Sequence, residues 1–207
     1  GAPDLQGRVR SGNSNWNVGN NLEGNGSELL MSYAGDDADR IRGISCDRIL
    51  YDEIQDIPYD GVIPVINECA AQSEYNFVTY AGTPKTLDNT IEFLWGTSTQ
   101  NEWCIRCHSC NNWNFYVAFA GIGKKGILCM KCGRYVNPRA GVWIPQNPRG
   151  SMHDFHIPQI ILPGNNAICA TDAKSYEKYL KRWQRILKKI DTGEYSETVF
   201  LNEVIGV

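Results

Sequence analysis

The clearest hydrophobic pattern in the chain is a short apolar run, residues 49–51, that ends abruptly in two adjacent acids, Asp52 and Glu53. Its length and content are typical of a buried strand, and Pro58 disfavours any continuation beyond the acids. A second run, residues 76–80, also ends in a turn. We therefore expect two strands, each of which stops where polar residues begin.

The segment between these runs, residues 62–72, predicts a helix with Pro64 in its first turn. Residues 90–96 predict a second, short amphipathic helix. A strand, a helix and a strand in this order are typical of a βαβ unit and favour a parallel sheet. Open sheets of this kind bind ligands at the carboxyl ends of their strands, so the turns after both runs are candidates for chemistry.

The end of the chain contains one long amphipathic helix, which Thr171 can cap and which we expect to reach Ile190. Its apolar positions are Tyr176, Tyr179, Leu180, Trp183, Ile186, Leu187 and Ile190. Its opposite face carries Lys174, Lys178, Lys181, Arg182, Arg185, Lys188 and Lys189. Residues 141–145 and 155–163 contain prolines and are expected as extended edge segments. Residues 1–27 are rich in Gly, Asn and Ser and are predicted as loop.

Composition places the chain among ordinary soluble proteins, with 207 residues of which 42% are apolar and 21% charged. No stretch approaches the length of a membrane span, so no membrane partner is expected. The chain opens with Gly1 and not with Met, which we interpret as the start of a fragment.

Charge is distributed unevenly along the chain. Residues 28–102 hold 14 acids and 4 Lys or Arg, whereas residues 103–149 hold 7 Lys or Arg and no acid. A basic segment in an acidic chain indicates a local anionic partner, and Lys124, Lys125 and Lys131 are its DNA-binding candidates. The basic helix face has two interpretations, a merely solvated surface or a second DNA contact.

The eight cysteines include two CxxC pairs, Cys107/Cys110 and Cys129/Cys132, separated by 18 residues. This spacing predicts a four-thiolate zinc site in a reducing compartment, with each pair on a tight turn that Asn111 and Gly133 assist. Four thiolates fill the tetrahedron, so the zinc is expected to be structural. Two alternatives stay open: Cys104 and Cys107 also form a CxxC pair, and His108 could replace a ligand.

Two phosphate-binding patterns can be set aside. Residues 121–126 match G-x-G-x-x-G, but they lie between the cysteine pairs with no room for a strand, turn and helix, so we predict a hairpin tip. No G-x-x-x-x-G-K-[ST] sequence occurs anywhere in the 207 residues.

The acid pair has two interpretations on its own: a solvated turn, or an Mg²⁺ ligand beside a base for water in a nucleotide-hydrolysing site. Ala81-Gly82-Thr83-Pro84 lies one βαβ unit later, and its Thr hydroxyl could report on a bound phosphate. This order favours the nucleotide interpretation.

Together these motifs resemble the large subunit of tailed-bacteriophage terminase, over roughly residues 27–207. The resemblance rests on Asp52-Glu53, on Ala81–Pro84, on the double-CxxC insert, and on the order of four further segments. Those segments are Ile41-Arg42-Gly43, Gly141-Val142-Trp143-Ile144-Pro145, Phe155-His156-Ile157-Pro158-Gln159 and Asn202-Glu203-Val204-Ile205-Gly206.

The resemblance implies a role for each matching residue. Asp52 would be the Walker B ligand of Mg²⁺, Glu53 the catalytic base, and Thr83 part of the motif that couples ATP hydrolysis to movement. Arg42 and Arg40 would contact phosphate or the nucleotide of a neighbouring subunit. The Walker A loop would precede Gly1 and the nuclease acids would follow Val207, so this chain alone is expected to be inactive.

The fold class expected is α/β: part of an ASCE-type P-loop ATPase sheet with a zinc-ribbon insert and a C-terminal amphipathic helix. The expected domains are an ATPase part at 1–102, the zinc ribbon at 103–138, and a return segment, helix and linker at 139–207. The resemblance implies double-stranded viral DNA, a portal protein and a small terminase subunit as partners. It also implies a homo-oligomeric ring in the host cytoplasm, bound transiently to the procapsid portal and absent from the mature virion.

Two other function classes fit parts of the pattern. A helicase-like ATPase shares the acid pair and a later Ser/Thr turn, but it does not predict the segments around Trp143 and Phe155 after a zinc ribbon. A zinc-ribbon module that binds nucleic acid or protein without hydrolysis accounts for the basic segment, and ATPase activity on adding the upstream segment would distinguish it from a motor.

Overall fold

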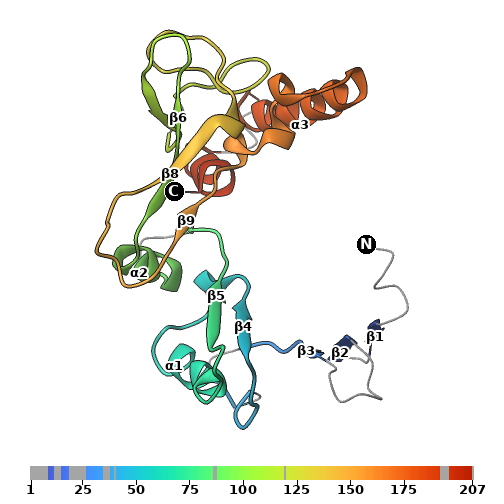
Figure 1. The fold of residues 1–207 in the computed structure, drawn as a ribbon, viewed down its shortest axis with the longest axis vertical. Coiled ribbons are helices and arrows are strands. Elements are labelled where there is room, and N and C mark those ends of the chain that lie inside the picture. The colour runs from blue at the N-terminus through green and yellow to red at the C-terminus, as the bar shows by residue number, and fades with distance from the viewer. Residues whose placement is uncertain are drawn as a thin grey trace. The chain divides into compact units, whose positions relative to one another are not determined.

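The computed structural model describes residues 9–11, 15–18, 27–34, 38–39, 41–85, 88–118, 120–191 and 196–206, which fold into two compact units (Figure 1). The first unit comprises residues 1–51 and 57–79, and the second comprises residues 52–56 and 80–207. The fold is mixed α/β with small sheets, which confirms the predicted class at this coarse level. Among the described residues, no helix combines the length and the apolar content needed to cross a membrane.

The strands are β1 (Val9–Ser11), β2 (Asn15–Val18), β3 (Ser27–Leu30), β4 (Arg48–Tyr51), β5 (Phe77–Tyr80), β6 (Asn101–Arg106), β7 (Trp113–Phe115), β8 (Gly141–Pro145) and β9 (Phe155–His156). The α-helices are α1 (Ile63–Asn67), α2 (Thr90–Thr97), α3 (Ala173–Asp191) and α4 (Glu197–Phe200), and a π-helix, η8 (Leu201–Ile205), follows α4.

In the first unit, β1, β2 and β3 form an antiparallel three-stranded sheet in that order. The prediction of loop for residues 1–27 is therefore wrong for β1 and β2. A ladder of this kind is held by backbone hydrogen bonds, so a Gly-, Asn- and Ser-rich composition weakens a strand without excluding it.

The strands β4 and β5 pair with each other, and α1 lies between them in sequence. The N–H of Phe77 donates to Asp47 O at 3.2 Å at the start of the pair, and the N–H of Ile54 donates to Ala81 O at 3.0 Å just beyond its end. From the first bond to the second, the residue numbers rise on both strands, so the two strands run in the same direction. The predicted strand–helix–strand order is present here in two strands, and Pro64 occupies the first turn of α1 as expected.

The second unit contains a sheet whose central strand is β6. β8 pairs along one side of β6, while β7 and β9 share the other side, β7 antiparallel and β9 parallel. Both proline-containing segments therefore lie at the sheet edge, as predicted from their missing N–H donors. β6 itself was not predicted, because its cysteine drew attention to ligand spacing instead of strand period.

Helix α3 packs its apolar stripe onto the core of the second unit. Trp183 is fully buried there and its Nε1–H donates to Gly123 O at 2.7 Å. The predicted cap is wrong by one residue: Asp172, not Thr171, accepts the N–H of Ser175 at 2.8 Å. The N–H of Asp172 donates back to Ser175 Oγ at 3.1 Å, so the helix starts with a reciprocal pair of capping bonds.

Candidate functional site

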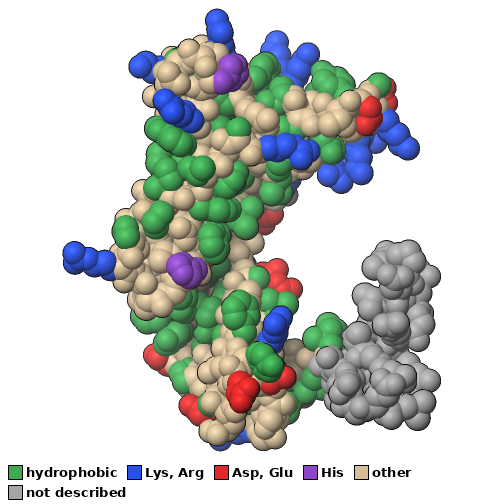
Figure 2. Space-filling model, viewed as in Figure 1, with side chains coloured by type: hydrophobic (Ala, Val, Ile, Leu, Met, Phe, Trp, Pro, Cys, Tyr) green, Lys and Arg blue, Asp and Glu red, His purple; other side chains and the backbone are tan. Residues whose placement is uncertain are grey.

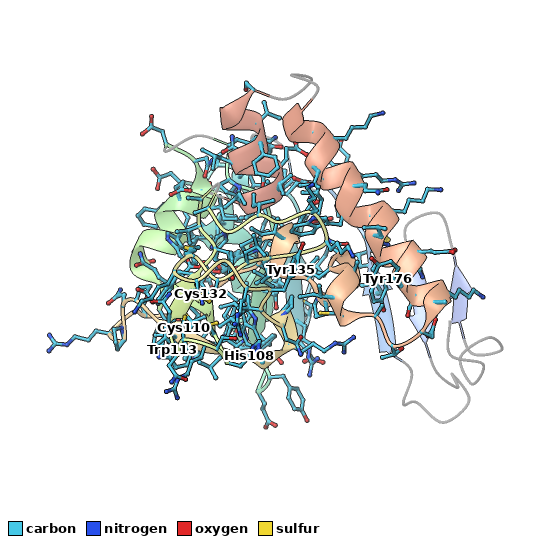
Figure 3. The ribbon with its side chains drawn as sticks, turned by 90° about the horizontal axis from the view of Figure 1, so that it is seen from above. His108, Cys110, Trp113, Cys132, Tyr135 and Tyr176 are labelled. Carbon is cyan, nitrogen blue, oxygen red and sulfur yellow. The ribbon has the colours of Figure 1, made fainter. Side chains whose placement is uncertain are left out.

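Four cysteines of the second unit form a cluster that could hold a metal ion: Cys107, Cys110, Cys129 and Cys132. Figure 3 labels two of them, Cys110 and Cys132. Their sulphur atoms all lie within 4.8 Å of one another. The distance from Cys107 Sγ to Cys132 Sγ is 3.7 Å, and that from Cys110 Sγ to Cys129 Sγ is 3.5 Å. Four sulphurs about 2.3 Å from a tetrahedral zinc ion lie about 3.8 Å apart, so the observed spacing fits such an ion.

The first cysteine pair sits on a tight turn. The N–H of Cys107 donates to Asn112 O at 2.8 Å, and the N–H of Asn111 donates back to Cys107 O at 2.9 Å. Asn111 has a φ of 59°, a left-handed conformation that asparagine tolerates better than most residues. The turn directs the N–H groups of Ser109 and Cys110 at the sulphur of Cys107.

The second pair repeats this turn at the same offsets. The N–H of Cys129 donates to Arg134 O at 2.7 Å, and the N–H of Gly133 donates to Cys129 O at 2.9 Å. Gly133 has a φ of 70° and so takes the place of Asn111. The N–H groups of Lys131 and Cys132 donate to Cys129 Sγ. The prediction that Asn111 and Gly133 assist the two turns is confirmed.

The protonation of the cluster is uneven. Burial raises the pKa of Cys129, but the N–H groups of Cys132 and Lys131 outweigh it and lower the pKa to about 6. The Asn112 N–H favours the thiolate of Cys110, but burial and the neighbouring sulphurs raise its pKa to about 12. Four adjacent thiolates repel one another, and a bound dication would remove that repulsion and displace the remaining protons.

Asn114 on β7 ties the two cysteine turns together. Its Oδ1 accepts the N–H of Met130 from the second turn at 2.9 Å, and its Nδ2 donates to Ile105 O and Asn112 O, both at 3.0 Å. The side chain is buried, so these bonds satisfy an amide that has little access to water. Sequence reasoning missed this residue, because an asparagine near a zinc motif has no distinguishing spacing.

The two alternative ligands lie outside the cluster. Cys104 is buried on β6, where burial and the charge of Glu102 raise the pKa of its thiol to about 12. Its sulphur lies 3.4 Å from Glu102 O. His108 is exposed. Of the quartets that the sequence left open, the structure therefore brings together the one without these two residues.

Residues 121–126 form a hairpin tip, as predicted. Ile122 and Ile127 make an antiparallel bridge, and the N–H of Gly123 donates to Gly126 O at 2.9 Å. No helix begins here, so the glycine pattern does not form a dinucleotide-binding turn.

The predicted DNA-binding lysines are exposed. Lys124 and Lys125 lie on the hairpin tip and Lys131 lies on the second cysteine turn. Lys125 Nζ lies 5.9 Å from the centre of the Tyr176 ring on α3. Figure 2 shows further basic side chains projecting from α3. Two basic surfaces of the second unit therefore present cations to solvent.

The acidic turn, residues 52–56, follows β4 directly. Asp52 and Glu53 are both exposed, and the N–H of Glu53 donates to Asp52 Oδ1 at 3.1 Å. Glu53 has a φ of 53°, which is uncommon for a residue other than glycine and concentrates at functional sites. The N–H of Asp56 donates to Glu53 O at 3.0 Å, and the Ile54 N–H is bonded to Ala81 O.

The turn that carries Thr83 lies against the acidic turn. The N–H of Thr83 donates to Gln55 Oε1 at 3.1 Å, and the Nε2–H of Gln55 donates to Glu53 Oε2. A Cβ at Gly82 would lie 2.2 Å from Gln55 Oε1 and 3.0 Å from Ile54 Cγ2, so this close approach requires glycine. The structure therefore brings together the acid pair and the Ala81–Pro84 turn, which are separated in sequence.

A polar cavity of about 290 Å³ lies beside these two turns. Its lining comprises Glu53, Gln55, Thr83, Pro84, Lys85, Val199, Asn202 and Glu203. Lys85 pairs with Asp56 at 2.6 Å, and Asn202 Nδ2 donates to Lys85 O at 3.2 Å. The cavity is at the lower limit for small-molecule sites and has room for about ten waters.

Of the two predicted phosphate-contacting arginines, the structure describes Arg42. Arg42 belongs to the first unit, where its Nε lies 3.1 Å from Asp39 Oδ1 in an exposed ion pair. Arg40 lies outside the described residues.

Comparisons of the chain with protein-family models, with curated proteins and with solved structures found no match. The residues and their geometry therefore carry the functional conclusion.

Proposed function

We propose that this chain is part of the ATPase motor of a tailed-bacteriophage terminase large subunit, which moves double-stranded DNA into procapsids. The observation that supports this most directly is the contact between the acidic turn and the Ala81–Pro84 turn. Both turns follow strands that run in the same direction, which is where open α/β sheets place their ligands. In this proposal β4 and β5 belong to an ASCE-type P-loop sheet.

The proposed roles follow from the exposure of the acids. Asp52 supplies carboxylate oxygens, the ligands that Mg²⁺ prefers, and a bound Mg²⁺ would neutralise charge on the phosphates of ATP. Glu53 borders the cavity and acts as the base that orients water. Thr83 is joined to Glu53 through Gln55, so it transmits changes at the bound nucleotide to the rest of the second unit. Arg42 and Arg40 remain proposed contacts for phosphate or for a neighbouring subunit's nucleotide.

We propose that the cysteine cluster binds one structural zinc ion. The sulphur distances, the paired turns and the N–H donors fit four thiolates around a dication. Four protein ligands complete the coordination, so the metal would fix the two turns and leave no open position for catalysis.

The wider assembly is proposed from the resemblance to the terminase family. It is a homo-oligomeric ring on the portal of a procapsid, with a small terminase subunit, in the host cytoplasm. The exposed lysines at the hairpin tip would face the DNA.

ATP hydrolysis tests the motor proposal. The 207 residues contain no P-loop pattern, so we expect no turnover from this chain alone. Joined to or mixed with a segment that carries a P-loop, it should hydrolyse ATP, and Glu53→Gln should lower the rate by at least about 100-fold. Glu74→Gln, at an exposed acid outside the turn, is the matched control. Turnover by the chain alone, or equal rates for both variants, would contradict the proposal.

A nucleic-acid-binding module without hydrolysis is the second candidate, and the acid-free segment 103–149 favours it. It predicts salt-dependent DNA binding with no ATP turnover under any pairing with a P-loop segment.

A further inference from the structure

Gln55 is the one buried polar residue in the acidic turn, and sequence reasoning gave it no role. Its side chain is 7% exposed although it lies between two exposed acids, Glu53 and Asp56. A glutamine this buried has to satisfy both ends of its amide, and here both ends are used. One end donates to Glu53 and the other accepts from Thr83.

The orientation of the amide follows from its two partners. Glu53 offers a carboxylate, which accepts only, and Thr83 offers a backbone N–H, which donates only. A flipped amide would set oxygen against oxygen at Glu53 and N–H against N–H at Thr83. The bridge therefore has a single favourable arrangement, from the carboxylate through the amide to the turn.

The surrounding backbone is shaped to this bridge. The missing side chain at Gly82 leaves room for Gln55 Oε1, because a Cβ at this position would overlap that oxygen. The left-handed conformation of Glu53 keeps its carboxylate within reach of an amide only two residues later. Ile54, fully buried between Glu53 and Gln55, is bonded through its N–H to Ala81 O. These features have a common effect, which is to hold Glu53 against the second turn.

We propose that Gln55 is the positioning residue of the acidic turn: it fixes the Glu53 carboxylate toward the polar cavity and links it to Thr83. This inference rests on the proposed ATPase function. Gln55 uses one carboxylate oxygen of Glu53, and the other remains to accept a proton from water in the cavity. A movement of Thr83 would move the Gln55 amide and with it the Glu53 carboxylate, without any contact between Gln55 and the nucleotide.

Three variants separate the two ends of the bridge. Gln55→Leu removes both bonds with little change in volume. Gln55→Glu keeps an acceptor for the Thr83 N–H but replaces the donor to Glu53 with a like charge. The double exchange Glu53→Gln with Gln55→Glu restores a bond between the two side chains while removing the base.

Hydrogen exchange of the Thr83 N–H, measured on the 207-residue chain, tests the bridge without any activity. We expect exchange to accelerate at least about 10-fold in Gln55→Leu and to stay near that of the original chain in Gln55→Glu and in the double exchange, because a hydrogen bond protects an amide. Unchanged exchange in Gln55→Leu would overturn the bridge.

Steady-state ATP hydrolysis, measured on the protein that contains this chain together with a P-loop, tests the positioning. Misplacing a reacting group by about 1 Å lowers rates by up to about 100-fold, so Gln55→Leu and Gln55→Glu should lower kcat by about 10- to 100-fold with KM changed less than about threefold. The double exchange should remain inactive although its Thr83 N–H is protected. Wild-type kcat in Gln55→Glu would overturn the positioning role. An inactive wild-type protein would instead remove the proposed ATPase function, and the exchange data would still decide whether the bridge exists.

Discussion

The cysteine cluster and the acidic turn are both built from tight turns of the second unit, but they are completed in different ways. Every ligand of the cluster, and most of the N–H groups that support it, come from residues 107–134. The acidic turn depends on Gly82 and Thr83, which lie 27 or 28 residues from the side chains they contact. A site made within one stretch can be read from spacing, whereas a site made by two distant turns needs the packing between them.

The two regions also differ in how strongly their chemistry is specified. Four clustered thiols have few uses other than metal binding or oxidation, and all eight cysteines are free. Two exposed carboxylates occur at sites of many functions. Only their contact with a second turn favours a nucleotide site over a solvated turn. Substitutions in both regions can test whether this difference is real.

The largest effect is expected from loss of one cluster ligand. Cys110→Ser should abolish zinc binding and unfold the cysteine turns, because structural zinc contributes on the order of 10 kcal/mol to small metal-dependent folds. Metal analysis and thermal unfolding measure both consequences. Cys104→Ser is the control, since Cys104 is more deeply buried than Cys110 but lies outside the cluster. Zinc lost in Cys104→Ser and kept in Cys110→Ser would reverse the assignment.

The next effect concerns which region supplies affinity for nucleic acid. Reversing the charge of Lys124, Lys125 and Lys131 to Glu should weaken DNA binding about 10- to 100-fold on all sequences alike and flatten its salt dependence. Binding titrations at several salt concentrations measure this. The same reversal of Lys174, Lys178 and Lys181 on α3 is the control. A loss with the α3 variant alone would move the contact to that helix.

Sequence reasoning reached some elements and missed others for identifiable reasons. The period of α3 and the offsets of the cysteine pairs are local, so α3 and the two turns were predicted closely. Strand β6 was missed because its apolar residues, Trp103 to Ile105, are adjacent and do not alternate with polar ones, and its cysteine drew attention to ligand spacing. Gln55 was missed because a glutamine between acids resembles a solvated turn until Gly82 is placed beside it. The partners of such a residue are set by tertiary packing, which spacing alone does not encode.

A smaller effect is expected from filling the space at Gly82. Gly82→Ala should lower the free energy of unfolding by about 1–3 kcal/mol, because its Cβ would overlap Gln55 Oε1 and crowd Ile54. Gly96→Ala is the control: apart from its chain neighbours and the backbone of α2, no atom lies within 4 Å of its Cβ position, so a gain of up to about 1 kcal/mol is expected. Denaturant unfolding measures both. Equal stability for the two variants would mean that the two turns do not pack closely.

The smallest effect concerns the residue that closes each cysteine turn. Gly133 and Asn111 occupy equivalent positions with φ values of 70° and 59°. Gly133→Ala should weaken zinc binding by about 1 kcal/mol, roughly fivefold, because alanine adopts the left-handed conformation at a cost. Asn111→Gly should leave the affinity equal or slightly higher, since glycine adopts that conformation freely. Both variants keep all four thiols and open space surrounds the Gly133 Cβ position, so a change reports backbone conformation and not a clash. Competition with a chelator of known affinity measures the difference. Equal weakening by the two variants would show that side-chain contacts, and not the shared left-handed turn, make the two halves of the cluster equivalent.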